Sequence, residues 1–409
     1  MRVTPIGAEH FGSGHPRLGR GSKVARNVIQ LASPFTVETI TDAAGLEGLR
    51  PAWDALLESS ESECVFLTWE WFSTWWKYFG EPGTLEIFVL RLNAEITAIA
   101  PFRIRPAGLR ERQGFPVLEF LGSGHVGSDY LDLIIRKGFE DDSLDALARA
   151  WQSANASRRF GFRWTNIRQE HSLAARAASL LEQDGWTSDE STINVCPYIS
   201  LGGCSWESYL ETLGAEHRGD FRRKWKRLNR DFAVEFAQAD QDTRLGFIDR
   251  LIEQHNRRWQ SRGGSDAFHT QALIDFHREV SQQMLDRGWL RLYALRLNGE
   301  PVALLYGFLF RGKFCFYQSS FDTAFEKYSV GTVIMGLAIQ RAIVEGAVEY
   351  DFLHGDETYK SHWSRESRTL ARLELYPPGV RGWLGHRYMK MGRFTLKLAR
   401  RVLNNTAAK

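Results

Sequence analysis

The chain has 409 residues, 43% of them hydrophobic and 25% charged, with a formal net charge of +3. These values are typical of a soluble globular protein with two domains and exclude a basic surface that is more than local. No run approaches the ~20 apolar residues of a membrane span. The four cysteines have no zinc-site spacing, which predicts buried thiols in a reducing, cytoplasmic compartment.

The first 35 residues lack an apolar run and are rich in Gly, Pro and Arg, so we expect a flexible lead-in rather than a secretory signal. Regular structure is predicted from Thr36. Residues 46–59 have the pattern of an amphipathic helix, and residues 65–80 that of a second, very aromatic helix that ends at Gly80.

Two hairpins carry a repeated pattern. Apolar runs meet at Asn93-Ala94 and again at Asn298-Gly299, where a tight turn needs positive φ. With Leu85 aligned to Leu290, seven of nineteen positions are identical, and each hairpin follows a helical segment that contains Trp. The pattern favours a duplicated helix-plus-hairpin unit. The alternative is that two amphipathic hairpins are alike by chance.

The remaining segments interleave strands and helices, which predicts mixed α/β sheets. In the first unit, Asp129 and Tyr130 follow a Gly-rich strand region and are candidates for a cleft between the units. Pro197 and the glycines after it mark a boundary. We therefore expect four parts, namely residues 1–35, 36–196, 197–380 and 381–409.

The helix predicted at 205–232 is strongly basic, and Arg222, Lys226 and Arg230 share one face. Three interpretations are open: a solvated face, a site for an anionic substrate such as a sugar nucleotide or lipid-linked glycan, and a nucleic-acid surface that includes tRNA. Trp259, beside Arg258, is either a wall on which a sugar stacks or part of the core.

A strand ending near Gln318 and Ser319 is followed by Ser329, Gly331 and Thr332 and by a helix that is apolar on nearly every side. Such a helix is buried, and its first turn offers backbone N–H groups to an anion. Gly331 would allow close approach of a diphosphate. The alternative is that Ser329 or Thr332 is a helix N-cap.

A second strand then leads into a polar loop that contains Asp356, Glu357, Tyr359 and Lys360. Its two histidines, His354 and His362, are not interpreted as metal ligands.

The strings "KYSVGT" and "DFLHGDETYKSHW", in this order, resemble the GNAT acyltransferase superfamily, and most closely its CelD-like and FemAB-like branch. The basic segments "RRKWKRL" and "HNRRW" resemble the same branch. The resemblance covers residues 36–377 and implies two tandem GNAT-like domains, of which the first is degenerate. The loop departs from the usual pattern because it offers Lys327 and only one glycine, with Val330 where the branch often has Pro.

The resemblance implies roles for single residues. Asp356, Glu357 and Tyr359 would be catalytic, as base candidates and as the acid for the leaving thiolate. The donor, acetyl-CoA, would contact Gln318, Ser319, Lys327, Ser329, Gly331 and Thr332. The acceptor would contact Arg222, Lys226, Trp259 and Lys360. No metal is implied.

The implied activity is transfer of an acetyl group to an amine or hydroxyl of a bacterial polysaccharide or cell-envelope precursor. Two alternatives stay open: aminoacyl transfer from aminoacyl-tRNA to a cell-wall precursor, and a non-catalytic scaffold in exopolysaccharide (cellulose) biosynthesis. The segment 381–409 is basic and amphipathic, which indicates either a peripheral contact with the anionic surface of the inner membrane or a helix packed on the body.

Overall fold

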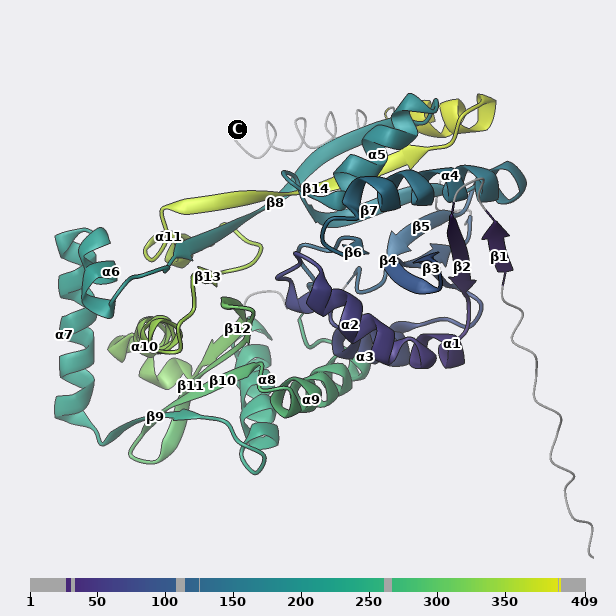
Figure 1. Ribbon diagram of the computed structural model, residues 1–409. Helices are drawn as coiled ribbons and strands as arrows, with labels where there is room; N and C mark the ends of the chain where they lie inside the picture. Colours follow the sequence, from purple (N-terminus) through teal and green to yellow (C-terminus); the bar gives the residue numbers. More distant parts are fainter. Residues whose placement is uncertain are drawn as a thin grey trace, which may run out of the picture.

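The computed structural model describes residues 27–30, 34–107, 115–124, 126–260, 267–388 and 390. These residues form a mixed α/β protein in which helices flank one continuous sheet (Figure 1). The strands are β1 (Asn27–Gln30), β2 (Phe35–Ile40), β3 (Leu85–Leu92), β4 (Glu95–Arg105), β5 (Val117–Phe120), β6 (Ile134–Ile135), β7 (Gly161–Arg168), β8 (Thr187–Ser200), β9 (Val234–Gln238), β10 (Leu290–Leu297), β11 (Glu300–Phe310), β12 (Lys313–Phe321), β13 (Glu349–Asp351) and β14 (Glu366–Tyr376).

The helices lie between these strands. They are α1 (Ala43–Gly48), α2 (Arg50–Ser59), η1 (Val65–Leu67), α3 (Trp69–Phe79), α4 (Glu140–Arg158), α5 (Leu173–Gln183), α6 (Trp206–Thr212), α7 (Ala215–Asp231), α8 (Arg244–Gln260), α9 (Gln271–Asp286), η2 (Thr323–Tyr328), α10 (Val330–Val344) and α11 (Thr358–Ser361). A further helical segment covers residues 380–388.

The order of the strands joins the two halves of the chain. In the described residues it is β1-β2-β3-β4-β5-β7-β14-β8-β13-β12-β11-β10-β9, with β6 paired to β4. The expected boundary between residues 196 and 197 therefore falls inside β8, which pairs with β14 on one edge and with β13 on the other. Strand β1, within the expected lead-in, pairs with β2. We retain the division into two units as a proposal about ancestry.

The two predicted hairpins are confirmed, and their irregularities match. Asn93 and Ala94 have φ of 50° and 73°, and Asn298 and Gly299 have φ of 52° and 89°. The pairing register shifts after Leu90 in β3 and at the equivalent position, after Leu295, in β10. A bulge at the same place in both hairpins is a specific backbone feature, so it supports a common origin of the two units.

Some helices differ from the predicted ones. The helix expected at 46–59 is divided at Leu49, because Pro51 starts a new helix in its first turn. The one expected at 205–232 is divided at Gly214. The Trp-containing helix α8 does not directly precede the second hairpin, because α9 lies between them.

Helix α10 is buried as expected, and it crosses α7 closely. A Cβ atom on Gly336 would lie 2.3 Å from a ring carbon of Phe221, so only glycine allows this approach. This crossing holds the basic helix α7 against α10, whose first turn contains Gly331 and Thr332 of the predicted donor loop.

Candidate active site

The site begins where two parallel strands separate. Strands β12 and β13 pair over only three residues, the last pair being Cys315 and Asp351. Beyond this pair, the segment after β13 remains paired with β8, since Phe352 N donates to Pro197 O at 2.9 Å. Strand β12 continues to Phe321, paired only with β11. One edge of β12 is thereby left without a strand partner among the described residues. A ligand with amide-like hydrogen-bonding groups could pair there.

A left-handed residue directs a histidine into this fork. Leu353 has a φ of 54°, which a branched side chain rarely adopts, and its N–H donates to the Asp351 carboxylate at 2.7 Å. His354 follows, and its backbone N–H donates to Asp129 Oδ2 at 2.8 Å. Strain of this kind persists only where neighbouring groups hold it, and it is concentrated at functional sites.

The same carboxylate holds the imidazole of His354. Nδ1 lies 2.9 Å from Asp129 Oδ2, and Asp129 is fully buried. The hydrogen bond and negative charge of Asp129 raise the pKa of His354 above its usual value, against the opposing effects of burial and of Lys360. With Nδ1–H bonded to a carboxylate, Nε2 carries the lone pair. It has no hydrogen-bond partner among the described residues.

His354 lines a cavity of about 350 Å³ at the fork. Gly127 of the first half closes one side, and a Cβ atom there would lie 3.5 Å from His354 Cε1. The cavity is therefore built from both halves of the chain, although Asp129 itself is fully buried and is not part of its lining. Four of the predicted site residues line it, namely Gln318, Glu357, Tyr359 and Lys360.

Lys360 supports the loop that carries His354. Its side chain is 4% exposed, and Nζ donates to His354 O at 2.7 Å and pairs with Glu357 Oε2 at 2.9 Å. A buried ammonium group is stable only when it is paired and hydrogen-bonded in this way. Its hydrogen bonds are thus used within the loop.

Tyr359 extends from the short helix α11 into the same cavity and is 40% exposed. Burial, followed by the charge of Glu357, raises the pKa of its phenol above the usual range. Tyr359 is therefore protonated at neutral pH.

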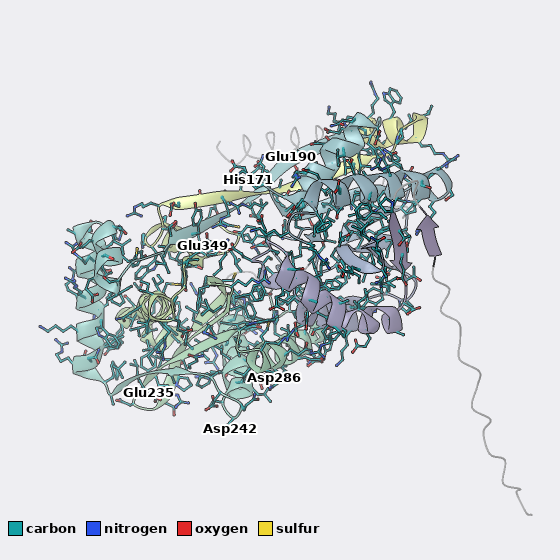
Figure 2. All side chains as sticks on the ribbon, in the orientation of Figure 1. His171, Glu190, Glu235, Asp242, Asp286 and Glu349 are labelled. Atoms are coloured by element: carbon teal, nitrogen blue, oxygen red, sulfur yellow. The ribbon has the colours of Figure 1, made fainter. Side chains whose placement is uncertain are left out.

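A second contact links the halves beneath the fork. Tyr130 Oη donates to Asp351 Oδ2 at 2.8 Å. Arg368 of β14 pairs at 2.6 Å with Glu349, whose position is labelled in Figure 2. Burial raises the pKa of Asp351 to about 6, while the charge of Arg368 and the bond from Tyr130 oppose that shift. This network fixes the end of β13 from which the loop of His354 departs.

A half-buried tyrosine and a buried histidine are among the residues that line the cavity. Tyr317 donates to Val126 O, and its hydroxyl lies 3.4 Å from His277 Nε2. Burial lowers the pKa of His277 to about 3, so the ring is neutral. Nδ1 of His277 has no partner among the described residues.

The predicted donor loop lies at the start of α10. Ser329 has a φ of 54° and makes no side-chain cap, which argues against its alternative role as an N-cap through its hydroxyl. A Cβ atom on Gly331 would lie 3.2 Å from the ring of Phe321, which is covered by the guanidinium of Arg258 at 4.5 Å. Only a residue without a side chain fits there easily, as a close-approach site requires.

The structure separates some of the predicted residues from the cavity. Asp356 is exposed and lies outside its lining. The same lining omits five of the six donor-site residues, Ser319, Lys327, Ser329, Gly331 and Thr332, which lie along β12, η2 and the first turn of α10. Their predicted contact with the donor stays a prediction.

The basic helix α7 lies at the far edge of the second half (Figure 1). Arg222 and Lys226 are exposed and form no ion pair with any described residue, whereas Arg230 pairs with Asp231 at 2.7 Å. Arg227 contacts η2, with its guanidinium 4.8 Å from the ring of Tyr328. The side chain of Trp259 lies outside the described residues, so its predicted role stays open.

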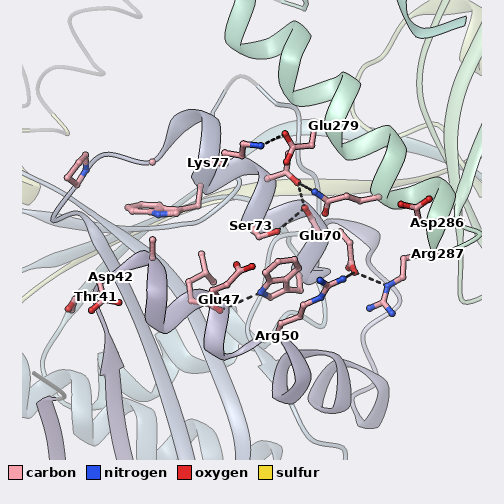
Figure 3. A pocket seen from close by; sticks show the side chains of 18 of the residues that line it. Thr41, Asp42, Glu47, Arg50, Glu70, Ser73, Lys77, Glu279, Asp286 and Arg287 are labelled. Carbon is pink, nitrogen blue, oxygen red and sulfur yellow. Dashed lines mark hydrogen bonds and ion pairs between the residues drawn. The ribbon is translucent and has the colours of Figure 1, made fainter. Parts of the chain in front are cut away.

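A larger cavity, of about 930 Å³, lies between α1, α3 and α9 (Figure 3). Its cations are neutralised by nearby carboxylates: Lys77 pairs with Glu279 at 2.6 Å, and Arg287 pairs with Glu70 at 2.8 Å. None of the predicted site residues lines it. Size alone therefore does not locate the chemistry.

The sequence predicts Asp129 as a cleft residue, but it gives His354, in the polar loop, no catalytic role. It missed their pairing, because 225 residues separate the two positions. The one available signal was a carboxylate after a Gly-rich loop in one half and a histidine after a strand in the other.

Comparisons with known proteins identify the domain and the fold. Residues 215–361 match the family model described as an acetyltransferase (GNAT) domain. The crystal structure of FemX is 11% identical, covers 79% of this chain and 95% of its own, and has a TM-score of 0.57. A conserved protein of unknown function from Bacteroides thetaiotaomicron is 13% identical over 82% of this chain and 99% of its own, with a TM-score of 0.54. No curated protein matches the sequence.

The opened strand pair and the helix that follows it define an acyltransferase fold. Residues 215–361 match a GNAT-type acetyltransferase domain, and the chain shares its fold with FemX. It is an N-acyltransferase enzyme. In the described part of the chain, no helix is long and apolar enough to cross a membrane, and no cluster of His, Cys, Asp and Glu could hold a metal ion.

Proposed function

We propose that the enzyme transfers an acetyl group from acetyl-CoA to an amine or hydroxyl of a bacterial polysaccharide or cell-envelope precursor, with His354 as the base. The observation that carries this proposal is the Asp129–His354 pair at the fork of β12 and β13. The description of the matched family supports the acetyl donor. The acceptor class rests on the resemblance in the sequence.

The residues present fit such a donor. Acetyl-CoA, when bound, supplies an activated thioester. The unpaired edge of β12 offers backbone groups, and the start of α10 offers first-turn N–H groups and the positive end of the helix dipole beside Gly331. Lys327 lies one turn before this point and adds positive charge.

Side chains of the protein can then accept and donate the protons that the reaction transfers. His354 Nε2 accepts the proton that the acceptor loses as its nitrogen or oxygen bonds to the acyl carbon. Asp129 holds the opposite ring nitrogen and stabilises the resulting imidazolium, which is the role of a carboxylate in a dyad of this type. Tyr359, which keeps its proton, delivers it to the sulfur when the carbon–sulfur bond breaks.

This assignment replaces Asp356 and Glu357 as the proposed base. Asp356 is exposed outside the cavity lining, and the carboxylate of Glu357 is already paired with Lys360. A base needs an available lone pair within reach of the acceptor, and His354 is the residue that meets this condition.

One observation favours a second candidate donor. Arg222 and Lys226 on α7 are exposed and lack ion-pair partners among the described residues, as a surface for an RNA backbone would require. In the alternative proposal the donor is aminoacyl-tRNA, and α7 contacts its phosphates.

Calorimetry with CoA, acetyl-CoA and bulk tRNA tests both proposals. We expect micromolar CoA binding that Gly331→Trp abolishes. Gly48→Trp is the control, because a Cβ atom on this remote helical glycine would meet nothing within 4 Å. Salt-sensitive tRNA binding without CoA binding would support the alternative. If CoA binds the Gly331→Trp variant as tightly as the natural chain, the donor site is wrongly placed.

A further inference from the structure

The segment 380–388 shows its large apolar side chains to solvent. Val380 is 74% exposed, Trp383 54%, Leu384 52% and Tyr388 45%. These four make up half of the eight large hydrophobic residues that are exposed in the described structure. They occupy positions i, i+3, i+4 and i+8, which lie on one side of a helix. A contiguous apolar surface of this kind marks a binding face.

The opposite side of this helix is the one that packs on the body. A Cβ atom on Gly382 would lie 1.7 Å from Pro377 O, and the ring of His386 packs 5.2 Å from that of Tyr376. The small residues thus let the helix backbone lie directly on the turn after β14. The helix is held in one orientation, and its apolar side chains face away from the protein because of that packing.

Basic groups surround the exposed face. Arg381 and Lys390 lie on its two flanks and are exposed, and the guanidinium of Arg387 lies 5.1 Å from the ring of Trp383. Trp and Tyr with Lys and Arg beside them are the combination found at the level of lipid headgroups.

A cavity of about 660 Å³ adjoins the start of this helix. Its lining includes Arg158, Arg159 and Arg381, against one carboxylate, that of Asp184. Arg158 is paired with Glu86 at 2.8 Å, but Arg159 and Arg381 form no ion pair with any described residue. Two uncommitted guanidinium groups in a hollow suit an anionic phosphate group.

From these two features together, we propose that this face of the protein docks on an anionic lipid bilayer. The apolar side chains of residues 380–388 would enter the headgroup region, and Arg159 and Arg381 would contact lipid phosphates. Neither feature involves the acyl-transfer cavity, so the proposal is independent of the donor and of the acceptor.

Flotation of the full-length protein with vesicles tests the proposal. The vesicles are phosphatidylcholine, with and without phosphatidylglycerol. We expect binding to the anionic vesicles that weakens with salt. The double variant Trp383→Glu/Leu384→Glu should lower the vesicle partition coefficient by about tenfold or more. Arg159→Glu/Arg381→Glu should do the same for anionic vesicles only.

Leu245→Glu is the matched control. This leucine of α8 is 45% exposed and is far in sequence from the exposed residues 380–388, so binding of this variant should equal that of the natural chain. Thermal melting verifies that each variant is folded, which is expected because every substituted side chain is exposed.

Three results would overturn the proposal. The first is no binding of the natural chain to anionic vesicles, and the second is equal binding by the Trp383→Glu/Leu384→Glu variant. The third is a dimer in light scattering that this variant converts to a monomer without any vesicle binding, because the face would then bind a second copy of the chain.

Discussion

Replacement of Asp129 by Asn removes one negative charge from a fully buried position and leaves the side-chain shape almost unchanged. Asp129 accepts both the backbone N–H and the Nδ1–H of His354, at 2.8 and 2.9 Å. A hydrogen bond to a charged group contributes about 1.5–3 kcal/mol. Because the imidazole is 42% exposed, water screens part of this interaction. Without the charge of Asp129, we expect the pKa of His354 to fall.

The sign of the effect on activity follows from the role of a base. Below its pKa, His354 is protonated and cannot accept a proton, so the rate falls on the acid side. Asp129 raises that pKa, and Asp129→Asn should move the acid limb of the rate profile to lower pH. The maximal rate should also fall by about 10²–10³-fold, since the amide stabilises the imidazolium less well.

Two measurements follow these effects. NMR titration of histidine-labelled protein, assigned with His354→Gln, gives the pKa without any knowledge of the acceptor. Release of CoA from acetyl-CoA, with water and a panel of UDP-amino sugars as acceptors, gives the rate. The double variant Asp129→Asn/His354→Gln should be no slower than His354→Gln alone. An unchanged pKa together with an unchanged acid limb would refute the role of Asp129.

Three further predictions concern the support of the site and the core. Lys360→Met should lower the free energy of unfolding by about 1–3 kcal/mol, because His354 O loses its buried donor. Urea titration measures this, and a raised KM for CoA with unchanged stability would instead mean that Lys360 binds the donor. His277, whose pKa is about 3 when folded, binds a proton near its ordinary pKa only when unfolded, so stability is lost as pH falls below about 6.5. Relative to His277→Gln, the natural chain should lose about 2 kcal/mol between pH 7 and pH 5, and parallel urea curves for the two proteins would contradict this. Gly336→Ala should cost about 1–3 kcal/mol because its new methyl group meets Phe221, whereas Gly48→Ala, in open space, should be neutral or stabilising; equal effects would remove the packing argument.

Local patterns in the sequence were sufficient where the physics is local. The turns at Asn93-Ala94 and Asn298-Gly299 need positive φ at two neighbouring residues, and an Asn followed by a small residue indicates such a turn. The buried helix α10 was predicted from apolarity on every side, and the structure begins it at Val330, two residues earlier than expected.

Features that depend on distant partners could not be predicted in this way. Strand β8 is mostly polar and contains Pro197, so it lacks strand periodicity, and its form comes from pairing with β13 and β14. Likewise, the exposure of Asp356 and the burial of Asp129 are set by the packing of the two halves. Residues of the polar loop line the cavity at the fork, but local sequence does not show that His354 is the one that faces the carboxylate of Asp129.

The pairing of β14 with both β7 and β8 has a consequence for synthesis of the chain. Two strands that precede residue 201 obtain their shared neighbour only after residue 366 has left the ribosome. The edges of β7 and β8 that pair with β14 therefore remain without that partner while most of the second half is translated. A fragment that stops at residue 361, where the family match ends, would keep those edges open permanently, and we expect it to aggregate or to recruit a chaperone.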